Sequence, residues 1–375
     1  MGLVRPVSVA WKELIQLRRD RLTLAMVLAL PILQLLLFGY AINTDVRHIP
    51  LAVYDQDRTA ASRDLARGLV ATGFFDAAGA VQSYGDIGRA LRTGQARAAL
   101  VVPPGFASDL KRGRATTAQL VVDGSDPQTV ASATNAAAGL AAARSAAITV
   151  LRRGPSGASA AAPVGIEPAV WYNPELKTAV FIVPGLVGVI LTMTMVMLTA
   201  MAIARERERG TLEQLIVSPV GRVELMVGKI LPYVVIGYLQ MTLILAAGAL
   251  IFRVPIGGSL PLLYALSFLF ISANLALGLF FSTLARTQQQ AMQMSFFFLL
   301  PNILLSGFMF PFEAMPRPAQ LLAEVLPLTH FLRIIRGVTL KGASFVELRS
   351  ELLALVAILL VLVTLASLRF RKRID

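Results

Sequence analysis

Six long apolar runs constrain what this chain can fold into. They cover residues 22–42, 178–204, 230–252, 262–285, 289–311 and 351–369, and none has a charged side chain inside its core. Each is close to the roughly 20 residues that an α-helix needs to cross the hydrocarbon core of a bilayer. Helices buried in soluble proteins rarely run so far without a charge. The sequence therefore predicts a membrane α-helical protein with six transmembrane helices, in keeping with its 56% hydrophobic residues.

The distribution of basic residues predicts how these helices are oriented, because Lys and Arg collect in short cytoplasmic segments. Basic residues flank the runs at Arg5, Lys12, Arg18, Arg19, Arg21, Arg205, Arg207, Arg209, Lys229, Arg286, Arg369, Arg371, Lys372 and Arg373. We therefore expect both termini, including the tail 370–375, the loop 205–229 and the turn 285–289 on the cytoplasmic side. This interpretation assigns the net charge of +13 to membrane orientation and not to nucleic acid.

Residues 43–177 differ in composition from the spans and predict a water-soluble domain between the first and second of them. Strand-like and helix-like stretches alternate along it, which is typical of a small α/β domain. Strands are expected at 49–54, 74–82, 98–103 and 118–123, with an extended segment at 164–172. Helices are expected at 62–71, 84–93, 105–111 and 127–151. Because the N-terminus and the loop after the second span are expected in the cytoplasm, this α/β domain between the first two spans is expected to be extracytoplasmic.

Two further segments are expected at the membrane surfaces. Residues 1–21 mix apolar and basic positions and predict an N-terminal cytoplasmic interfacial helix. The run 22–42 that follows is longer than the apolar region of a signal peptide, so we expect it to be retained as the first span. Prolines between Pro311 and Pro327 divide 312–350 into pieces too short to span, which predicts outer re-entrant or interfacial helices.

A short charged stretch separates the second and third spans. Residues 205–209 alternate Arg and Glu, and Thr211-Leu-Glu-Gln214 fits a capping box. Gly210 allows the chain to bend before this helix, and Pro219 ends it. Its apolar side would carry Leu212, Leu215 and Ile216. Such an amphipathic helix is either a docking surface for a partner or only a solvated loop with one helical turn.

The residue pattern disfavours catalytic or metal chemistry. The chain has no cysteine, and neither His48 nor His330 has metal-ligand spacing. It has no G-x-S-x-G elbow, and Gly228-Lys229 lacks the upstream glycine of a P-loop. The cores of the predicted spans hold no Asp, Glu or His, which ion-coupled transporters use. A transport role would therefore need free energy from a separate ATPase.

The charged stretch also carries a family resemblance. Arg205-Glu-Arg-Glu-Arg-Gly-Thr-Leu-Glu-Gln-Leu-Ile-Val-Ser-Pro219 resembles the E-R-E-x-G-T-x-E-x-L-x-x-[ST]-P segment of ABC-2 type exporter permeases. Trp171-Tyr-Asn-Pro-Glu-Leu-Lys177 and Val183-Pro-Gly185 are similar to the subgroup with a large extracytoplasmic domain after the first span. The Pro-rich region 311–340 resembles the outer re-entrant helices of that family. The resemblance covers nearly the whole chain.

The resemblance implies the membrane subunit of an ATP-driven exporter in the inner membrane of a bacterium. The chain would bind no cofactor itself, since ATP and Mg²⁺ would be held by a separate cytoplasmic nucleotide-binding subunit. A second permease, identical or related, and membrane lipid would be partners, and a periplasmic adaptor is left open. The loop would contain the ATPase-coupling helix. Its expected coupling residues are Glu206, Arg207, Glu208, Gly210, Thr211, Leu212, Glu213, Leu215 and Ile216.

Polar side chains within the spans are candidates for a substrate path. Gln240, Asn274, Gln293 and Asn302 should face the interior of the bundle or of a dimer. They either line a route for an amphipathic substrate, such as a drug or lipid, or only hydrogen-bond neighbouring helices. An alternative function is a membrane-anchored sensor or scaffold whose outer domain binds a ligand. An intramembrane enzyme is disfavoured, because the spans lack pairs of acid, base or nucleophile.

Overall fold

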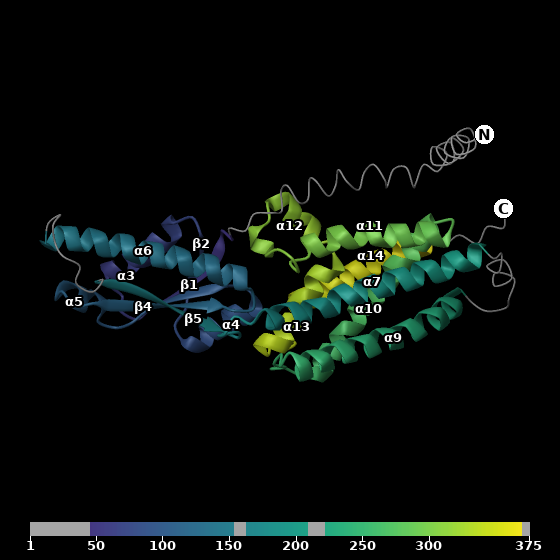
Figure 1. Ribbon diagram of the computed structural model, residues 1–375, viewed down its shortest axis with the longest axis horizontal. Helices are drawn as coiled ribbons and strands as arrows, with labels where there is room; N and C mark the ends of the chain where they lie inside the picture. Colours follow the sequence, from purple (N-terminus) through teal and green to yellow (C-terminus); the bar gives the residue numbers. More distant parts are fainter. Residues whose placement is uncertain (1–45, 154–162, 209–221, 370–375) are drawn as a thin grey trace, which may run out of the picture.

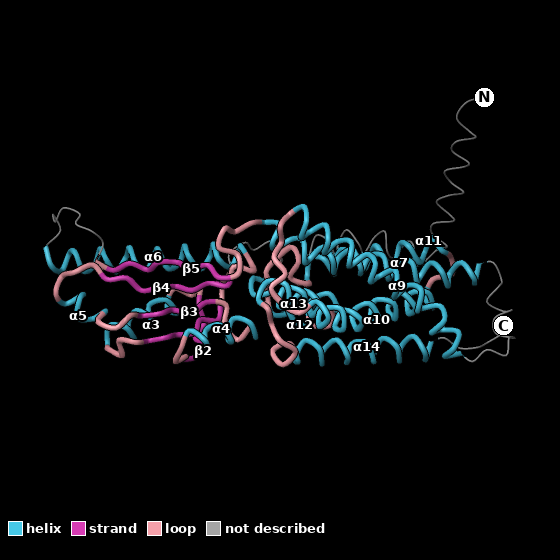
Figure 2. The backbone as a smooth tube through the Cα atoms, turned by 90° about the horizontal axis from the view of Figure 1, so that it is seen from below, coloured by secondary structure: helices cyan, strands magenta, loops and turns pink. Residues whose placement is uncertain are grey.

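The computed structural model describes residues 46–153, 163–208 and 222–369. They form two parts that lie end to end, an α/β domain and a bundle of long helices (Figure 1). Figure 2 shows the strands gathered in the first part and the long helices running away from them. We call the end of the bundle beside the α/β domain the domain end, and the opposite end the far end.

A five-stranded sheet forms the centre of the α/β domain, in the order β2-β1-β3-β4-β5. Its strands are β1 (Ile49–Asp55), β2 (Phe75–Ala80), β3 (Ala98–Val102), β4 (Thr116–Asp123) and β5 (Val164–Trp171). Strand β1 pairs in parallel with β2 and β3, and β4 pairs in parallel with β5. Only β3 and β4 are antiparallel. The prediction of an α/β domain is confirmed.

Helices cover both faces of this sheet, because successive strand side chains point to opposite sides. The helices are α3 (Ala60–Ala71), α4 (Tyr84–Thr93), α5 (Phe106–Lys111) and α6 (Pro127–Arg153). Leu51 and Leu100 pack in one core with residues of α3, α5 and α6. Their neighbours Ala52 and Val101 pack in a second core with α4.

The expected strands and helices of this domain are confirmed, with small differences at their ends. Helix α4 matches its predicted bounds because its local signals are strong. The Ser83 side chain accepts a hydrogen bond from the Asp86 amide at the start of the helix. Gly94 ends the helix in the left-handed region, with φ of 73°, where glycine is favoured.

The described part of the bundle contains five long helices. They are α7 (Thr178–Glu208), α9 (Arg222–Ile251), α10 (Leu260–Leu284), α11 (Gln288–Leu305) and α14 (Arg349–Arg369). Three short elements lie between α11 and α14 at the domain end: η1 (Phe312–Ala314), α12 (Arg317–Ala323) and α13 (Pro327–Lys341).

Among the described residues, four helices are long and apolar enough to cross a membrane. They are Ala179–Glu208, Pro232–Ile251, Leu260–Leu284 and Arg349–Arg369. The predicted span 289–311 corresponds to α11, which is less apolar because Gln288, Gln289, Gln290 and Gln293 occupy its first turns. The predicted span 22–42 and the interfacial helix 1–21 lie outside the described residues. The prediction of a helical membrane protein is therefore confirmed, whereas the number of six spans stays a prediction.

Helix α13 is packed inside the domain end of the bundle. Most of its residues are buried, and it contacts α7, α10 and α14. The Phe331 ring stacks on Phe270 of α10, with centroids 4.0 Å apart and planes 3° apart. The apolar residues of this helix thus anchor it in the largest apolar core that the described residues form.

Helices α7 and α10 approach each other closely at Gly278. A Cβ atom at this position would lie 2.7 Å from the Val196 carbonyl oxygen and 2.9 Å from the Thr199 Cβ. Small residues allow such backbone approach between membrane helices. The outer faces of α9 and α14, by contrast, expose large apolar side chains, including Leu239, Leu243, Leu353 and Leu360. These faces are suited to lipid or to another apolar partner surface.

We predict that Gly278→Ala lowers the apparent Tm of the purified protein in detergent. The added methyl group must push the α7 backbone away, and such overpacking costs about 1–3 kcal/mol. Gly139→Ala in α6 is the control, because nothing lies within 4 Å of its added Cβ. Alanine is also the better helix former, so the control should keep or raise the apparent Tm. Equal melting of the two variants would contradict this account of the α7–α10 contact.

Candidate functional site

The charged last turn of α7 contacts the turn between α10 and α11 at the far end. The Arg207 Nη1 donates to the carbonyl oxygens of Ser282, at 3.1 Å, and Ala285, at 2.7 Å. Helix α10 ends at Leu284, so these carbonyls belong to the helix end that lacks intrahelical donors. A cation there also complements the negative end of the helix dipole.

Glu208 makes the matching contact with the start of α11. Its Oε1 accepts from the Gln288 amide at 2.9 Å, and its Oε2 accepts from the Gln288 Nε2 at 2.6 Å. Arg205 adds a hydrogen bond from its Nε to the Gln288 Oε1, at 3.0 Å. A carboxylate is favourable at a helix N-terminus, where free amides point outward. We call these contacts of Arg205, Arg207 and Glu208 with residues 282–288 the α7 clamp.

The described part of the predicted coupling segment is therefore Glu206, Arg207 and Glu208, on the last turn of α7. Gly210, Thr211, Leu212, Glu213, Leu215 and Ile216 lie outside the described residues. From the sequence, the alternating charges were expected to serve a partner, and their contact with residues 282–288 was missed. A signal was present, since Thr287 followed by three glutamines is a helix start that a nearby carboxylate can cap.

The four predicted path residues lie on three different helices. Gln240 of α9 accepts from the Thr194 Oγ1 of α7 at 2.8 Å. Asn274 of α10 is buried, and its Nδ2 donates to the Phe270 carbonyl at 2.9 Å. On α11, Gln293 is half-buried and Asn302 is buried. The Asn274 Oδ1 and both side-chain amide atoms of Asn302 have no hydrogen-bond partner among the residues that the structure describes. Within the described ranges, no hydrogen bond joins any two of the four.

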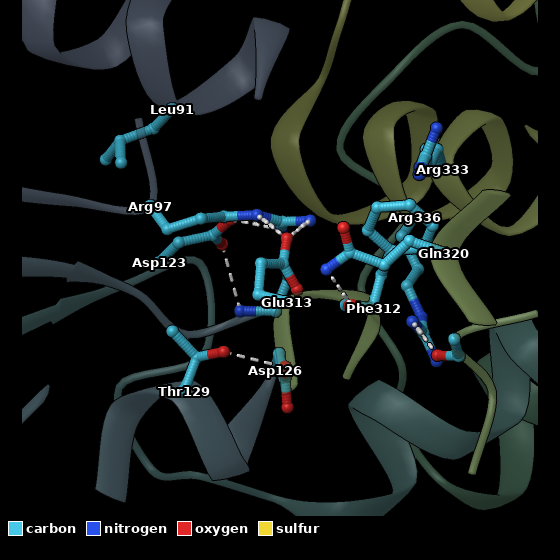
Figure 3. Close-up of polar contacts among 12 residues, drawn as sticks. Leu91, Arg97, Asp123, Asp126, Thr129, Phe312, Glu313, Gln320, Arg333 and Arg336 are labelled. Atoms are coloured by element: carbon cyan, nitrogen blue, oxygen red, sulfur yellow. Dashed lines mark hydrogen bonds and ion pairs between the residues drawn. The ribbon is translucent and has the colours of Figure 1, made fainter. Parts of the chain in front are cut away.

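A second set of charged contacts joins the α/β domain to the bundle. Asp123, at the end of β4, is 1% exposed and accepts from Lys341 Nζ and, at 3.1 Å, from Arg97 Nη1. Arg97 also pairs with Glu313 of η1, at 3.0 Å (Figure 3). Lys341, at the end of α13, donates to the Leu91 carbonyl as well. We call this set of residues the charged junction.

Asp123 and Arg97 of the charged junction are ionised at neutral pH. Burial alone would raise the pKa of Asp123, but Lys341 and Arg97 outweigh it and hold the pKa at about 2. The Glu313 carboxylate is the main cause that raises the pKa of Arg97. A further pair, Arg92 with Glu347 at 2.8 Å, joins α4 to the segment before α14. Sequence reasoning missed these residues, although Asp123 directly follows an apolar strand.

The fold is that of a multi-pass helical membrane protein, with four candidate spans among the described residues. At the far end, side chains of α7 cap the ends of two other helices. At the domain end, ion pairs join the α/β domain to the bundle. The chain belongs to the ABC-2 family of transporter proteins, since the family described as ABC-2 family transporter protein matches residues 21–368. It is a permease subunit and is not itself catalytic.

Relatives from Escherichia coli (strain K12) cover nearly the whole chain. The probable multidrug ABC transporter permease YbhS is 31% identical over 367 residues, covering 97% of this chain and 96% of YbhS. The probable multidrug ABC transporter permease YbhR is 31% identical over 365 residues, covering 97% of each protein. The inner membrane transport permease YhhJ is 36% identical over 217 residues, covering 56% of this chain and 57% of YhhJ. In such a family, ATP binding is typical of a partner ATPase.

We predict that Asp123→Asn destabilises the charged junction by about 3–5 kcal/mol, because it leaves Lys341 and Arg97 buried beside a neutral group. The apparent Tm of the purified protein should fall accordingly. Asp109→Asn is the control in the same domain. Its more exposed carboxylate lies 3.9 Å from Arg114, so its loss should change stability little.

The same carboxylate should make the stability of the protein depend on acidity. The folded pKa of Asp123, about 2, lies below its ordinary value of 3.8. Its ionised form therefore adds stability that is complete above pH 3.8 and is lost as the pH falls toward 2. Melting curves over this range should show a larger loss for the wild type than for Asp123→Asn. Parallel losses would show that Asp123 is not the group involved.

Proposed function

We propose that this chain is the membrane permease subunit of an ATP-driven exporter that moves an amphipathic substrate out of the cytoplasm or inner leaflet of a bacterium. The observation that carries the proposal is the α7 clamp. The segment expected to couple to an ATPase follows directly after residues that hold the ends of two other helices. A push on that segment would therefore act on α7, α10 and α11 together.

The proposed orientation puts the far end in the cytoplasm. The end of α7, the turn 285–287 and the end of α14 share this end of the bundle (Figure 1). Arg205, Arg207, Arg286 and Arg369 lie there, in line with the distribution of basic residues in cytoplasmic segments. Both termini would then be cytoplasmic and the α/β domain extracytoplasmic. The inner membrane is the corresponding location, as in the name of the relative YhhJ.

ATP and Mg²⁺ would be bound by a separate cytoplasmic ATPase subunit. Gly210, Thr211, Leu212, Glu213, Leu215 and Ile216 would form the helix that enters its surface. A small apolar contact surrounded by charges combines affinity with a defined register. The clamp residues would then transmit the displacement of this helix to the bundle.

A second permease is the other proposed partner. Similarity to both YbhR and YbhS, two permeases of one organism, supports a paired assembly. The apolar outer faces of α9 and α14 offer surfaces for that partner or for membrane lipid. A periplasmic adaptor would meet the α/β domain, if one takes part. Nucleic acid has no place in this assembly.

The proposed substrate is drug-like or lipid-like. The relatives are named as probable multidrug permeases, and an amphipathic molecule fits a route between apolar helices. Gln240, Asn274, Gln293 and Asn302 are the proposed polar points on this route. The unpaired amide atoms of Asn302 support that role, because a buried amide without a partner is costly to retain.

We predict that Gly210→Pro and Leu215→Asp each abolish export while the protein remains inserted in the membrane. Proline would prevent the bend before the coupling helix, and aspartate would place a charge in its apolar contact. The measurement is efflux of Hoechst 33342 from cells, with co-purification of the ATPase subunit. Loss of both identifies the docking surface. A membrane sensor or scaffold would instead keep its partner without ATP-dependent efflux.

We also predict that Arg207→Ala keeps the ATPase subunit bound but lowers efflux by about tenfold, which is the scale of one lost charged hydrogen bond. Arg286→Ala is the matched control, since it removes an equal charge from the same turn. The Arg286 side chain is exposed and makes no hydrogen bond with the described residues. If the two variants export equally well, the α7 clamp does not transmit the motion.

A further inference from the structure

A cavity of about 610 Å³ lies at the boundary between the α/β domain and the bundle. The α/β domain contributes Arg92, Arg97 and Asp126 to its wall, and the bundle contributes Glu313 and Arg336. Figure 3 shows Arg97 on one side of this region and Arg333 and Arg336 on the other. The volume is within the range of pockets that hold small molecules.

The acidic residues of the cavity wall are already engaged. Glu313 pairs with Arg97, and Glu347 pairs with Arg92. Glu351 contacts both His330 and Arg333, and Asp76 contacts His48. The last is Asp126, which accepts from the Thr129 hydroxyl at 2.8 Å and from the Gln128 amide at 3.0 Å, at the start of α6.

Arg336 differs from the other half-buried cations of this wall. Its Nη1 donates to the Gly307 carbonyl at 3.1 Å, and its guanidinium lies 4.0 Å from the centroid of the Phe181 ring. Its Nε and Nη2 are buried and have no hydrogen-bond partner in the described ranges. No carboxylate of the described residues lies within ion-pair distance of it, whereas Arg92, Arg97, Arg333 and Lys341 each have one.

Arg336 therefore contributes to the cavity wall a positive charge that no carboxylate of the described residues pairs, and two of its donors have no partner among them. Burial lowers the pKa of Arg336 to about 10, so the guanidinium stays charged at neutral pH. Arg317 lies at the cavity wall as well and is exposed. A guanidinium offers its Nε and Nη2 donors side by side, which matches the two oxygens of a carboxylate or phosphate.

The rest of the wall includes apolar side chains that can accept the body of an amphipathic molecule. These are Pro311, Phe312, Met315, Leu332 and Leu348. Phe312 is held by the Arg333 guanidinium, which lies 4.5 Å from its ring centroid. The cavity therefore offers a charged point within a partly apolar wall.

We infer that this junction cavity binds the anionic group of an amphipathic molecule, with Arg336 as the residue that receives the carboxylate or phosphate. The site lies in this chain alone and requires neither ATP nor an ATPase subunit. Its existence is thus independent of the proposed export function. If Arg336 had only a structural role, it would hold the turn at Gly307 against Phe181 and bind no anion.

The test uses the purified full chain in dodecyl maltoside and a fluorescent probe, 11-(dansylamino)undecanoic acid. Its methyl ester, which lacks the charge, measures binding by the apolar body alone. The wild type should bind the acid more tightly than the ester. The Arg336→Gln variant should bind the acid about tenfold or more weakly than the wild type, which is the scale of a charged hydrogen bond. Arg112→Gln, which removes an exposed charge from the α/β domain, should change the binding of neither probe.

Two results would overturn the inference. One is equal binding of acid and ester to the wild type, and the other is unchanged binding of the acid to Arg336→Gln. If Arg336→Gln does not fold, Ser350→Trp replaces it, because Ser350 is exposed and lines the cavity. The indole should occupy part of the cavity and weaken binding of the acid with Arg336 in place. Unchanged binding in Ser350→Trp would equally overturn the inference.

Competition then identifies the source of the anion. Nanodiscs with phosphatidylglycerol should displace the probe, and nanodiscs of phosphatidylcholine alone should not, if the natural ligand is a lipid headgroup. Displacement only by a soluble anion, decanoate, assigns the cavity to free organic anions. Either result supports an anion site, and displacement by none of the three competitors contradicts it.

Discussion

The contacts of Arg207 and Glu208 with the ends of α10 and α11 hold three helices of the bundle together at the far end. Apolar helices pack along their length through dispersion and small residues, which allow sliding. Helix ends differ, since their unpaired carbonyls and amides need specific partners. One arginine and the next glutamate supply a donor to one helix end and an acceptor to the other. Two neighbouring residues of α7 therefore connect three helices at the far end.

The domain end is held in a different way, by buried ion pairs between parts that are distant in sequence. Asp123 receives both Lys341 and Arg97, so a single carboxylate joins the sheet to α13. Such a cluster is costly to separate, because each charge would remain partly buried without its partner. Because separating these charges would destabilise the protein, the α/β domain and the domain end of the bundle should move together. Helix α13, stacked on α10 through Phe331, carries this connection into the apolar core.

Local patterns made most elements predictable, whereas contacts between distant elements were not. Helix α4 is bounded by Ser83 and Gly94, whose effects extend over only a few residues, and its predicted bounds were correct. The apolar runs likewise predicted the four candidate spans, because a bilayer requires about 20 such residues. Asp123 and Lys341 lie 218 positions apart, and Arg207 and Ala285 lie 78 apart. Nothing local to these residues indicates which partner each meets, so both charged sites became visible only in the fold.

Helix α7 links the two ends, because it takes part in both. Its first turn carries Phe181, on which the Arg336 guanidinium stacks, and its last turn carries the clamp residues. Its 31 residues span about 46 Å at 1.5 Å per residue. Close packing against α10 at Gly278 resists bending of α7 away from the bundle. A displacement applied beyond Glu208 would therefore reach Phe181 and the Arg336 guanidinium that stacks on it, beside the junction cavity. A signal from the far end need not pass through the cavities between helices, since one continuous helix already touches both sites.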